Sequence, residues 1–383
     1  DPLPRAEHAA WRDALQRRMA RAGVDALLLT TPADVFYVTG FLTRFWESPA
    51  RPWFVVLPAA GEPVAVIPAI GAPLMARAGL ADIRTWPAPR PGDDGIGLLA
   101  ETLRETVPQD GRVGVPMGAE THLRMPLADF EVLRARLQPR AFTDATEIVH
   151  RVREIKSAAE IDAIRTICTI AGRAFDAVPA RVREGQPLDA VFRDFQVSLL
   201  QEGADWVAYL AGGAGQGGYG DVISPAGPNP LRSGDVLMLD TGAVRGGYFC
   251  DFDRNFRVGP LDPDTVRAQH ALFDATEAAL DSARPGMTAA DLHTVMHGFL
   301  TRAGVEPADG RLGHGLGLAL TEWPSFTPLD RTPLRAGMVL TLEPGVTLGP
   351  GRMLVHEEVI ALTETGATLL SPRAPRDMPG IGR

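Results

Sequence analysis

Two aspartates in the second half of the chain, Asp240 and Asp251, limit the possible folds more than any other feature. The apolar run 236–239 leads into Asp240, and the Thr-Gly pair at 241–242 is expected to end that strand. Glycines at 246–247 then turn the chain, so the segment predicts a β-hairpin with one carboxylate on each arm. Two carboxylates that face each other must share a proton, pair with cations or bind metal. Taken alone, the pattern fits two aspartates of surface loops equally well.

Three further side chains in this half favour a metal site. His314 lies between two glycines, which allow close approach of the backbone to a ligand. Glu343 lies near the end of the strand predicted for 338–344, and Glu357 lies in the middle of the strand predicted for 353–362. A carboxylate in an apolar strand is costly unless it is paired or bound to metal. Four carboxylates and one imidazole form a hard, oxygen-rich set, which suits a pair of divalent ions such as manganese, cobalt or zinc.

In their order along the chain, these five residues resemble the metal site of the pita-bread metallopeptidases of family M24. That family includes Xaa-Pro aminopeptidases, prolidases, methionine aminopeptidases and the metal-free creatinase. The matching segments are LDTGAVRGGYFCDFDRNF, GHGLGL, LTLEPGV and VHEEVIAL. The resemblance extends over nearly the whole chain. It implies an α/β creatinase-like N-terminal domain followed by an α+β pita-bread domain with a pseudo-twofold repeat.

The length of 383 residues is too great for one ordinary core and indicates two domains. Because the segment 152–157 resembles the family's linker, we expect a creatinase-like domain over residues 1–150 and a catalytic domain over 151–383. Helical and strand patterns alternate in the first domain, which favours a mixed sheet covered by helices. The helices are predicted at 5–22, 96–106 and 127–137, and the strands at 24–30, 53–58, 64–68 and 113–115.

A weak internal repeat supports the pseudo-twofold arrangement of the second domain. Ser157 is expected to cap a helix over 158–178, with Glu160 completing a capping box. Two more helices are predicted after the similar segments 183–187 and 284–288. Each ends at a glycine and leads toward a strand and then a segment that carries candidate ligands. Two such halves facing each other would place the carboxylates in a central cleft.

Composition excludes several classes of function. The net charge of −9 and the lack of a basic run argue against a nucleic-acid partner. No apolar run approaches 18 residues, and no signal-peptide pattern opens the sequence, so we expect neither a membrane partner nor export. Two cysteines imply no disulfide framework. We therefore expect a cytoplasmic protein, and the resemblance implies a homodimer.

The resemblance also assigns roles to the matched residues. It implies that Asp251 and Glu357 bridge two metal ions, and that Asp240 and His314 each bind one of them. Glu343 would be a ligand and would also shuttle a proton from the attacking water to the leaving nitrogen. The predicted protein is a dinuclear metal-dependent hydrolase, an Xaa-Pro dipeptidase or aminopeptidase that cleaves short peptides by attack of a metal-bridging water. The ligand set accepts manganese, cobalt, zinc or iron.

The departures from the family pattern bear on substrate choice. The family's peptidases carry a second histidine seven residues after the metal histidine, where this chain has Thr321. They carry another upstream of the first aspartate, but no histidine lies between His150 and His270. An arginine two residues before the last glutamate is replaced by Val355. Loss of one oxyanion donor can lower the rate by about a hundredfold or more.

Several residues are candidates to compensate or to line the substrate pocket. Thr321, Tyr248 and His356 are the candidates to replace the missing imidazoles. His356 also has a structural alternative, because its neighbour Glu357 should point to the opposite face of a strand. Glu322 and Trp323 follow the metal histidine closely and are expected to line the pocket, with loop packing as the alternative.

Two other functions remain open at this point. The missing histidines are also compatible with a small-amide hydrolase or a metal-dependent lyase on the same scaffold. The family's DMSP lyases share the Glu-Trp-Pro segment but have an aspartate where Thr321 stands, so lyase chemistry is not favoured. A non-catalytic binding module is disfavoured, because such a protein has no need of all five ligands.

Overall fold

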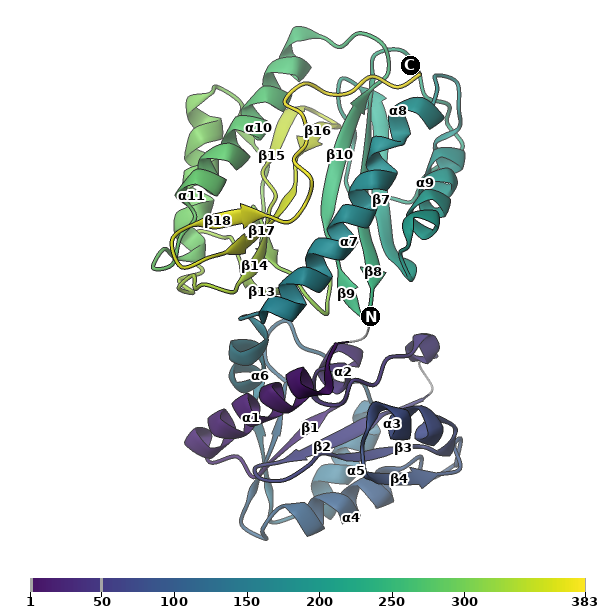
Figure 1. Cartoon of the computed structure of the whole chain (residues 1–383), viewed down its shortest axis with the longest axis vertical. Coiled ribbons are helices and arrows are strands. Elements are labelled where there is room, and N and C mark those ends of the chain that lie inside the picture. The colour runs from purple at the N-terminus through teal and green to yellow at the C-terminus, as the bar shows by residue number, and fades with distance from the viewer. Residues whose placement is uncertain (1–2, 49–50, 383) are drawn as a thin grey trace. The chain divides into compact units, whose positions relative to one another are not determined.

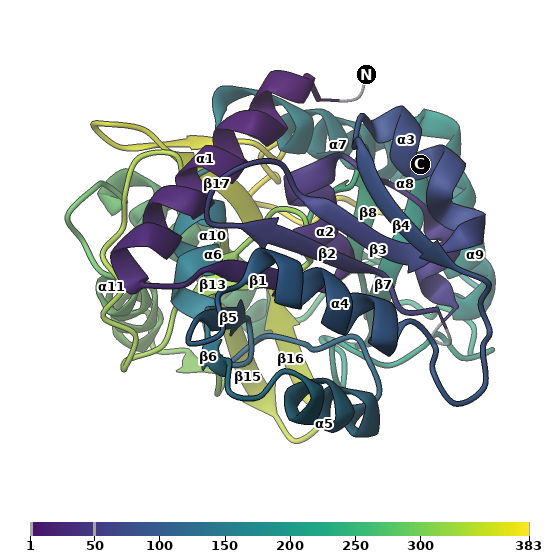
Figure 2. The same ribbon diagram turned by 90° about the horizontal axis from the view of Figure 1, so that it is seen from below.

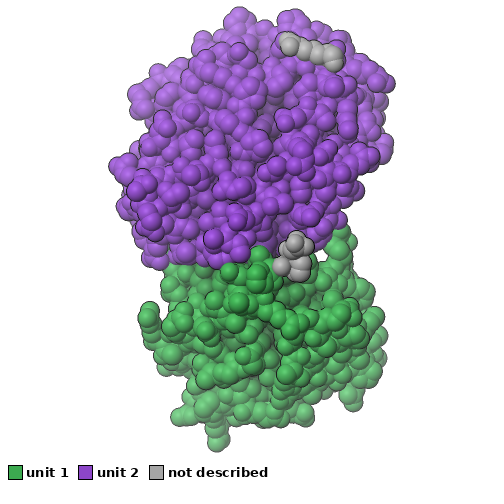
Figure 3. All heavy atoms as spheres, in the orientation of Figure 1, with its two compact units in different colours: residues 1–153 green, residues 154–383 purple. Residues whose placement is uncertain are grey.

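A computed structural model describes residues 3–48 and 51–382 of the chain (Figure 1). By its internal contacts the chain divides into two compact units, Asp1–Arg153 and Glu154–Arg383 (Figure 3). Each unit has its own sheets and its own buried core. Among the described residues, no helix combines the length and the apolar character needed to cross a membrane.

The first unit is built on a mixed six-stranded sheet with the strand order β4-β3-β2-β1-β5-β6. The pairs β1–β5, β5–β6 and β3–β4 are parallel, whereas β1–β2 and β2–β3 are antiparallel. The elements are α1 (Arg5–Ala22), β1 (Ala26–Leu29), α2 (Pro32–Thr39), η1 (Arg44–Glu47), β2 (Phe54–Pro58), β3 (Val64–Pro68), η2 (Ala69–Gly71), α3 (Ala72–Ala78), β4 (Asp82–Trp86), α4 (Ile96–Thr106), β5 (Arg112–Val115), α5 (Leu127–Arg136), β6 (Ala141–Asp144) and α6 (Thr146–Arg153).

A continuous apolar core explains why this sheet is covered by helices. Leu28 of β1 and Val56 of β2 pack in one buried cluster with Leu99 and Leu103 of α4 and Leu133 of α5. Helix α4 packs against β2, β3 and β4, and Figure 2 shows it running alongside β2. The predicted α/β class and the predicted helices and strands of this unit are confirmed.

The second unit contains separate antiparallel sheets flanked by helices. Their strand orders are β10-β8-β7 with β9 added to β8, β11-β15-β16, and β13-β12-β14-β17-β18. The helices are α7 (Ala158–Asp176), α8 (Val178–Arg181), α9 (Leu188–Glu202), α10 (Pro263–Ser282) and α11 (Ala289–Arg302). The strands are β7 (Trp206–Gln216), β8 (Asp235–Arg245), β9 (Tyr248–Phe249), β10 (Phe252–Arg257), β11 (Glu306–Pro307), β12 (His314–Gly315), β13 (Glu322–Ser325), β14 (Val339–Leu342), β15 (Gly345–Gly349), β16 (Arg352–Val355), β17 (Glu358–Leu362) and β18 (Ala367–Leu369).

The order of these elements repeats within the unit. Helix α9 leads into the antiparallel strands β7 and β8, and helix α11 leads into the segment with His314 on β12 and Glu343 just after β14. In Figure 1, α10 and α11 lie on one side of the strands and α8 and α9 on the other. The helix pairs thus flank a central region of sheet, as the pita-bread fold requires.

Ser157 begins helix α7 through the predicted capping box. Its hydroxyl accepts the backbone N–H of Glu160 at 3.3 Å, and the Glu160 carboxylate accepts the N–H of Ser157 at 2.9 Å. The two contacts satisfy donors that the first turn of a helix leaves unpaired.

Replacing Ser157 by alanine should therefore lower the free energy of unfolding by about 1 kcal/mol, because one of those donors loses its acceptor. Urea unfolding would measure the change. Thr166→Ala, on an exposed turn of the same helix, is the matched control and should change stability by less than about 0.5 kcal/mol. Equal effects of the two substitutions would contradict a capping role for Ser157.

Two details of the predicted strands are wrong. Strand β8 does not end at 241–242 but continues to Arg245. Gly242 pairs with β7 inside the strand, and Leu320 packs so closely there that an added Cβ would lie 2.3 Å from its side chain. The predicted strand 353–362 is two strands, since β16 pairs with β15 and β17 pairs with β14 in a different sheet. Glu357 lies where the chain passes between the sheets, not in the middle of a strand.

Candidate metal site

The candidate ligands come from strand ends and strand junctions of the second unit. Asp240 lies on β8, directly opposite Asp253 of β10, and Asp251 immediately precedes β10. His314 begins β12, Glu343 follows β14, and Glu357 joins β16 to β17. Side chains from both halves of the unit therefore meet in one place.

The glycines on either side of His314 serve the packing of strands. A Cβ at Gly313 would lie 2.2 Å from the Thr341 carbonyl oxygen, and one at Gly315 would lie 2.3 Å from that of Trp323. The strands β13 and β14 can approach β12 this closely only because glycines stand there. This close approach fixes the position of the histidine, whose N–H donates to the Thr341 hydroxyl at 3.1 Å.

Three of the five side chains converge closely enough to share one ion. Potential ligand atoms of Asp251, His314 and Glu357 all lie within 4.8 Å of one another, and all three residues are buried. His314 Nε2 is 3.3 Å from Asp251 Oδ2 and 4.0 Å from Glu343 Oε2. The Nδ1 of His314 lies 2.7 Å from the Gly315 carbonyl oxygen, which only a donating N–H can satisfy. In the neutral ring, Nε2 therefore carries the lone pair that a metal requires.

The cluster concentrates several carboxylates in one buried place, where their negative charges repel one another. Burial, and then repulsion by neighbours that include Asp251, raises the pKa of Asp240 and of Glu357 well above their usual values. Burial also raises the pKa of Asp251, and it raises that of Glu343 to about 6. Burial opposes the charged form of His314, but the hydrogen bond to Asp251 and the negative charges of Asp251 and Glu343 together outweigh it and raise the pKa. Bound cations would relieve all of these penalties at once.

Unpaired oxygen atoms are a second indication of a metal site. Among the described residues, buried Asp240 Oδ1, Glu357 Oε1 and Asp253 Oδ2 have no hydrogen-bond partner. An unsatisfied buried polar group costs about 1–3 kcal/mol, more when it is charged. Two of these atoms belong to predicted ligands, so the donor set fits divalent cations on chemical grounds as well as by position.

Asp253 is a residue of this centre that the sequence analysis missed. It is 1% exposed, and its Oδ1 accepts the backbone N–H of Glu357 at 2.9 Å. Burial raises its pKa to about 7. Asp253 holds the junction that carries Glu357 and adds another acid to the cluster. The alternation of side chains along a strand could have found it, because residues 251 and 253 face the same side.

Arg311 is a second residue that was missed. Its guanidinium donates to the Thr321 hydroxyl at 3.2 Å. Its positive charge contributes to lowering the pKa values of Asp251 and Glu343, although burial outweighs this for both. The one sequence signal was an arginine three residues before the candidate metal histidine.

The structure places Glu322 in loop packing. One carboxylate oxygen accepts the backbone N–H groups of Leu318 and Ala319 at 2.9 and 3.2 Å, and the other forms a 2.9 Å ion pair with Lys156. The carboxylate thus closes the turn that follows His314, which fits the packing alternative. Trp323 follows on β13 and is part-buried.

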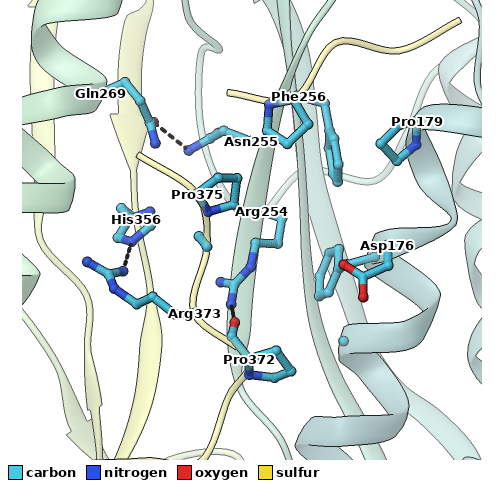
Figure 4. A pocket seen from close by; sticks show the side chains of 14 residues that line it. Asp176, Pro179, Arg254, Asn255, Phe256, Gln269, His356, Pro372, Arg373 and Pro375 are labelled. Atoms are coloured by element: carbon cyan, nitrogen blue, oxygen red, sulfur yellow. Dashed lines mark hydrogen bonds between the residues drawn. The ribbon is translucent and has the colours of Figure 1, made fainter. Parts of the chain in front are cut away.

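The Tyr248 hydroxyl and the His356 ring form hydrogen bonds with residues that are not among the five candidate ligands. The Tyr248 hydroxyl donates to Glu160 at 3.1 Å. His356 Nε2 accepts from Arg373 at 2.7 Å inside a separate pocket that Arg254 also lines (Figure 4). Burial lowers the pKa of His356 to about 3, so the ring is neutral and acts as the acceptor. The structural alternative for His356 fits this placement, because neighbours in extended backbone point to opposite sides.

Comparison with known proteins gives matches over both units. A model of metallopeptidase family M24 matches residues 162–364, and a model of the creatinase/prolidase N-terminal domain matches residues 12–155. A probable dipeptidase PepE of Mycobacterium tuberculosis is 31% identical over 359 residues, covering 91% of this chain and 90% of the relative. An Xaa-Pro dipeptidase of Pyrococcus horikoshii is 29% identical over 258 residues, covering 67% of this chain and 72% of the relative.

Solved structures match the whole chain. The crystal structure of dipeptidase PepE from Mycobacterium ulcerans superposes with a TM-score of 0.85 at 29% identity, over 100% of both chains. The prolidase from Pyrococcus horikoshii superposes with a TM-score of 0.83 at 22% identity, covering 95% of this chain and 99% of that one. At that identity the prolidase match shows the shared two-domain fold alone.

Proposed function

The chain belongs to metallopeptidase family M24 and is a peptidase, and from this premise we propose that it is a dinuclear dipeptidase that cleaves Xaa-Pro or similar short peptides. The observation that carries the proposal is the buried cluster in which Asp251, His314 and Glu357 offer ligand atoms within 4.8 Å of one another. The names of the relatives, dipeptidase and Xaa-Pro dipeptidase, support the substrate class.

The residues of the cluster divide into distinct tasks. Asp251 and Glu357, at the centre of the cluster, would bridge two ions, while Asp240 and His314 would each hold one. When bound, such ions supply a Lewis acid for the scissile carbonyl and lower the pKa of water toward neutrality. Asp253 keeps Glu357 in place through its backbone N–H, and the Nδ1 contact to Gly315 keeps the His314 ring in the tautomer that can bind metal.

Glu343 is the residue of the cluster that we propose as the proton carrier. Its side chain is 26% exposed, compared with 3% for His314 and 7% for Asp251, so it is the most accessible of these three to a substrate. A carboxylate beside a bound water is a suitable general base and acid for such a reaction. Glu343 can therefore accept the proton of the attacking water and return it to the leaving nitrogen.

The other functions considered are less well supported. A small-amide hydrolase or lyase is not favoured, because the relatives found over most of the chain are named as dipeptidases. A non-catalytic module does not account for an acidic cluster with unpaired buried oxygens. Manganese as the metal, the homodimer and the cytoplasmic location remain predictions.

A panel of Ala-Pro, Met-Pro, Leu-Pro and Ala-Pro-Pro, offered to protein reconstituted with manganese, tests the proposal. We expect turnover of the dipeptides and its loss in Asp251→Ala, since that variant removes a shared ligand. Cleavage of the tripeptide alone would indicate an aminopeptidase instead. No turnover of any peptide by protein with bound metal would contradict the proposed function.

A further inference from the structure

The backbone around Glu357 is tied to the segments that carry the other candidate ligands. We call residues 356–358, where the chain passes between two sheets, the junction. The N–H of Glu357 donates to Asp253, and its carbonyl oxygen accepts from Arg254 Nη1 at 2.9 Å. The first N–H of the junction donates to the carbonyl oxygen of Pro344 at 3.1 Å. Hydrogen bonds to other segments thus replace a strand ladder here.

The two neighbours of Glu357 in the junction turn their side chains away from the carboxylate cluster. Side chains in extended backbone alternate between opposite sides, so His356 and Glu358 share the side that Glu357 does not face. Both residues are 1% exposed, so their polar groups need partners in the interior. A group that holds these two side chains also sets the direction in which Glu357 points.

Arg373 holds both neighbours with a single nitrogen. It belongs to the C-terminal segment, residues 370–382, which follows β18. Its Nη1 donates to His356 Nε2 at 2.7 Å and to Glu358 Oε1 at 2.9 Å. Figure 4 shows its guanidinium beside the His356 ring. The residues before and after Glu357 are therefore clamped together from the side opposite the cluster.

The other donors of Arg373 fix the orientation of its guanidinium against α10. Nη2 donates to the Phe273 carbonyl oxygen at 3.1 Å and to the Thr276 hydroxyl at 3.0 Å. Nε donates to Glu277 at 2.7 Å, and the guanidinium carbon lies 3.8 Å from the centroid of the Phe273 ring. With the two contacts of Nη1, each of the five N–H donors has an acceptor. The planar group is thus held in one orientation.

Glu358 and His356 differ in how much they depend on Arg373. The Glu358 carboxylate also accepts from Arg254 Nη2 at 3.0 Å and from the Ala374 N–H at 2.9 Å. The His356 ring lines a cavity of about 120 Å³. A cavity provides no packing contacts on that side, so the orientation of the ring depends on its hydrogen bond to Arg373.

We propose that Arg373 is a positioning residue of the metal site. By holding His356 and Glu358 on one side of the junction, it directs the Glu357 carboxylate toward the ions on the other side. The C-terminal segment thereby becomes part of the metal centre, although it supplies no ligand. The inference rests on the proposed dinuclear site and adds the residue that orients one of its bridging carboxylates.

Titration of metal-free protein with manganese, followed by electron paramagnetic resonance, tests this role. In wild type, two manganese ions bridged by Glu357 should give the signal of an exchange-coupled pair. Arg373→Met keeps an unbranched side chain without donors and should weaken manganese binding by about 10- to 100-fold, as is usual when a group that orients a ligand is removed. At saturating manganese, a larger share of the signal should come from isolated ions.

Arg376→Met is the matched control. Arg376 lies in the same C-terminal segment and donates to Asp274 of α10 at 2.7 Å. The substitution therefore removes an arginine that ties the same segment to the same helix without contacting the junction. Manganese affinity and the coupled signal should equal those of wild type.

Two substitutions of His356 keep the test decisive if Arg373→Met does not fold. His356→Leu removes the acceptor and should weaken manganese binding in the same direction. His356→Gln has an amide oxygen that can accept from Arg373, so it should restore most of the affinity and the coupled signal.

Three results would overturn the inference. Folded Arg373→Met with the manganese affinity and coupled signal of wild type, even at a lower midpoint of thermal unfolding, would show that the arginine only stabilises the fold. Equal losses in Arg376→Met would assign the effect to docking of the whole C-terminal segment. Manganese binding by His356→Leu that matches wild type would show that the clamp does not orient Glu357.

The same titration separates this inference from the proposed function. If wild type forms the coupled pair but cleaves no dipeptide, the proposed function fails, and loss of the pair in Arg373→Met still supports the inference. If wild type binds no second ion, both fail.

Discussion

Replacing Glu343 by glutamine should lower kcat for a dipeptide by about a thousandfold. Glutamine preserves the size of the side chain and one oxygen donor, but it cannot accept the proton of the attacking water. General acid–base catalysis typically contributes about 10²- to 10⁴-fold, and Glu343 is proposed here for both transfers. Steady-state kinetics of Ala-Pro hydrolysis at saturating metal would measure the effect. KM should change little, because the lost interaction belongs to the transition state.

Glu364 provides the control for this substitution. It is an exposed glutamate in the turn after β17, so Glu364→Gln removes the same charge away from the site. Its kcat should equal that of wild type. A Glu343→Gln variant that binds metal normally and retains kcat within about tenfold would show that another group carries the proton.

Removing the metal should destabilise the protein by about 4 kcal/mol when the ion had been present at about a thousand times its Kd. The midpoint of thermal unfolding would then fall by roughly 10 °C for a unit of this size. The reason is the set of buried carboxylates, whose mutual repulsion is no longer offset by cations. Differential scanning calorimetry with and without a chelator would measure the difference.

The metal effect should grow as the pH rises from 5 to 7. In the metal-free fold, burial raises the pKa of Glu343 to about 6, above its ordinary value of 4.5, and raises those of Asp240 and Glu357 further. Between the unfolded and folded pKa values the folded state holds more protons, so the stability of the metal-free protein falls as pH increases. Metal binding needs the ionised carboxylates, so its stabilisation increases over the same range.

A variant can check that this pH dependence arises at the cluster. Asp251→Asn removes one charge from the cluster and one shared ligand, so it should reduce both the chelator effect and its growth with pH. A chelator effect of the same size at pH 5 and pH 7 in wild type would contradict the electrostatic explanation.

Features of the fold and the site that have a local sequence signature could be predicted. The hairpin with Asp240 and Asp251 and the glycines around His314 could be predicted because turns and costly buried charges have local signatures. The family and the two-domain fold followed from the same motifs and are confirmed by the family models and structural matches. The residues named from the sequence as ligands lie in one cluster in the structure.

The features that could not be predicted depend on contacts between segments that are far apart in the sequence. The apolar pattern runs without a break through Glu357, and only the pairing of β16 and β17 in different sheets shows where the chain turns. Arg311 donates a hydrogen bond to Thr321, ten positions away, and Asp253 accepts one from the backbone of Glu357, 104 positions away. The sequence around one position gives no indication of its distant partner in such a contact. The absence of the family's imidazoles could therefore be noticed from the sequence, but the residues around those positions in the structure could not be named.

We propose that one buried acidic cluster holds two ions and that these ions make the chain a dipeptidase. A titration of metal-free protein with manganese, following bound metal and Ala-Pro hydrolysis together, tests it most directly. We predict that the rate rises to a plateau at two ions per chain, and that Asp251→Asn shows neither the second ion nor the activity. Hydrolysis that does not depend on bound metal, or a plateau that survives in Asp251→Asn, would contradict the account.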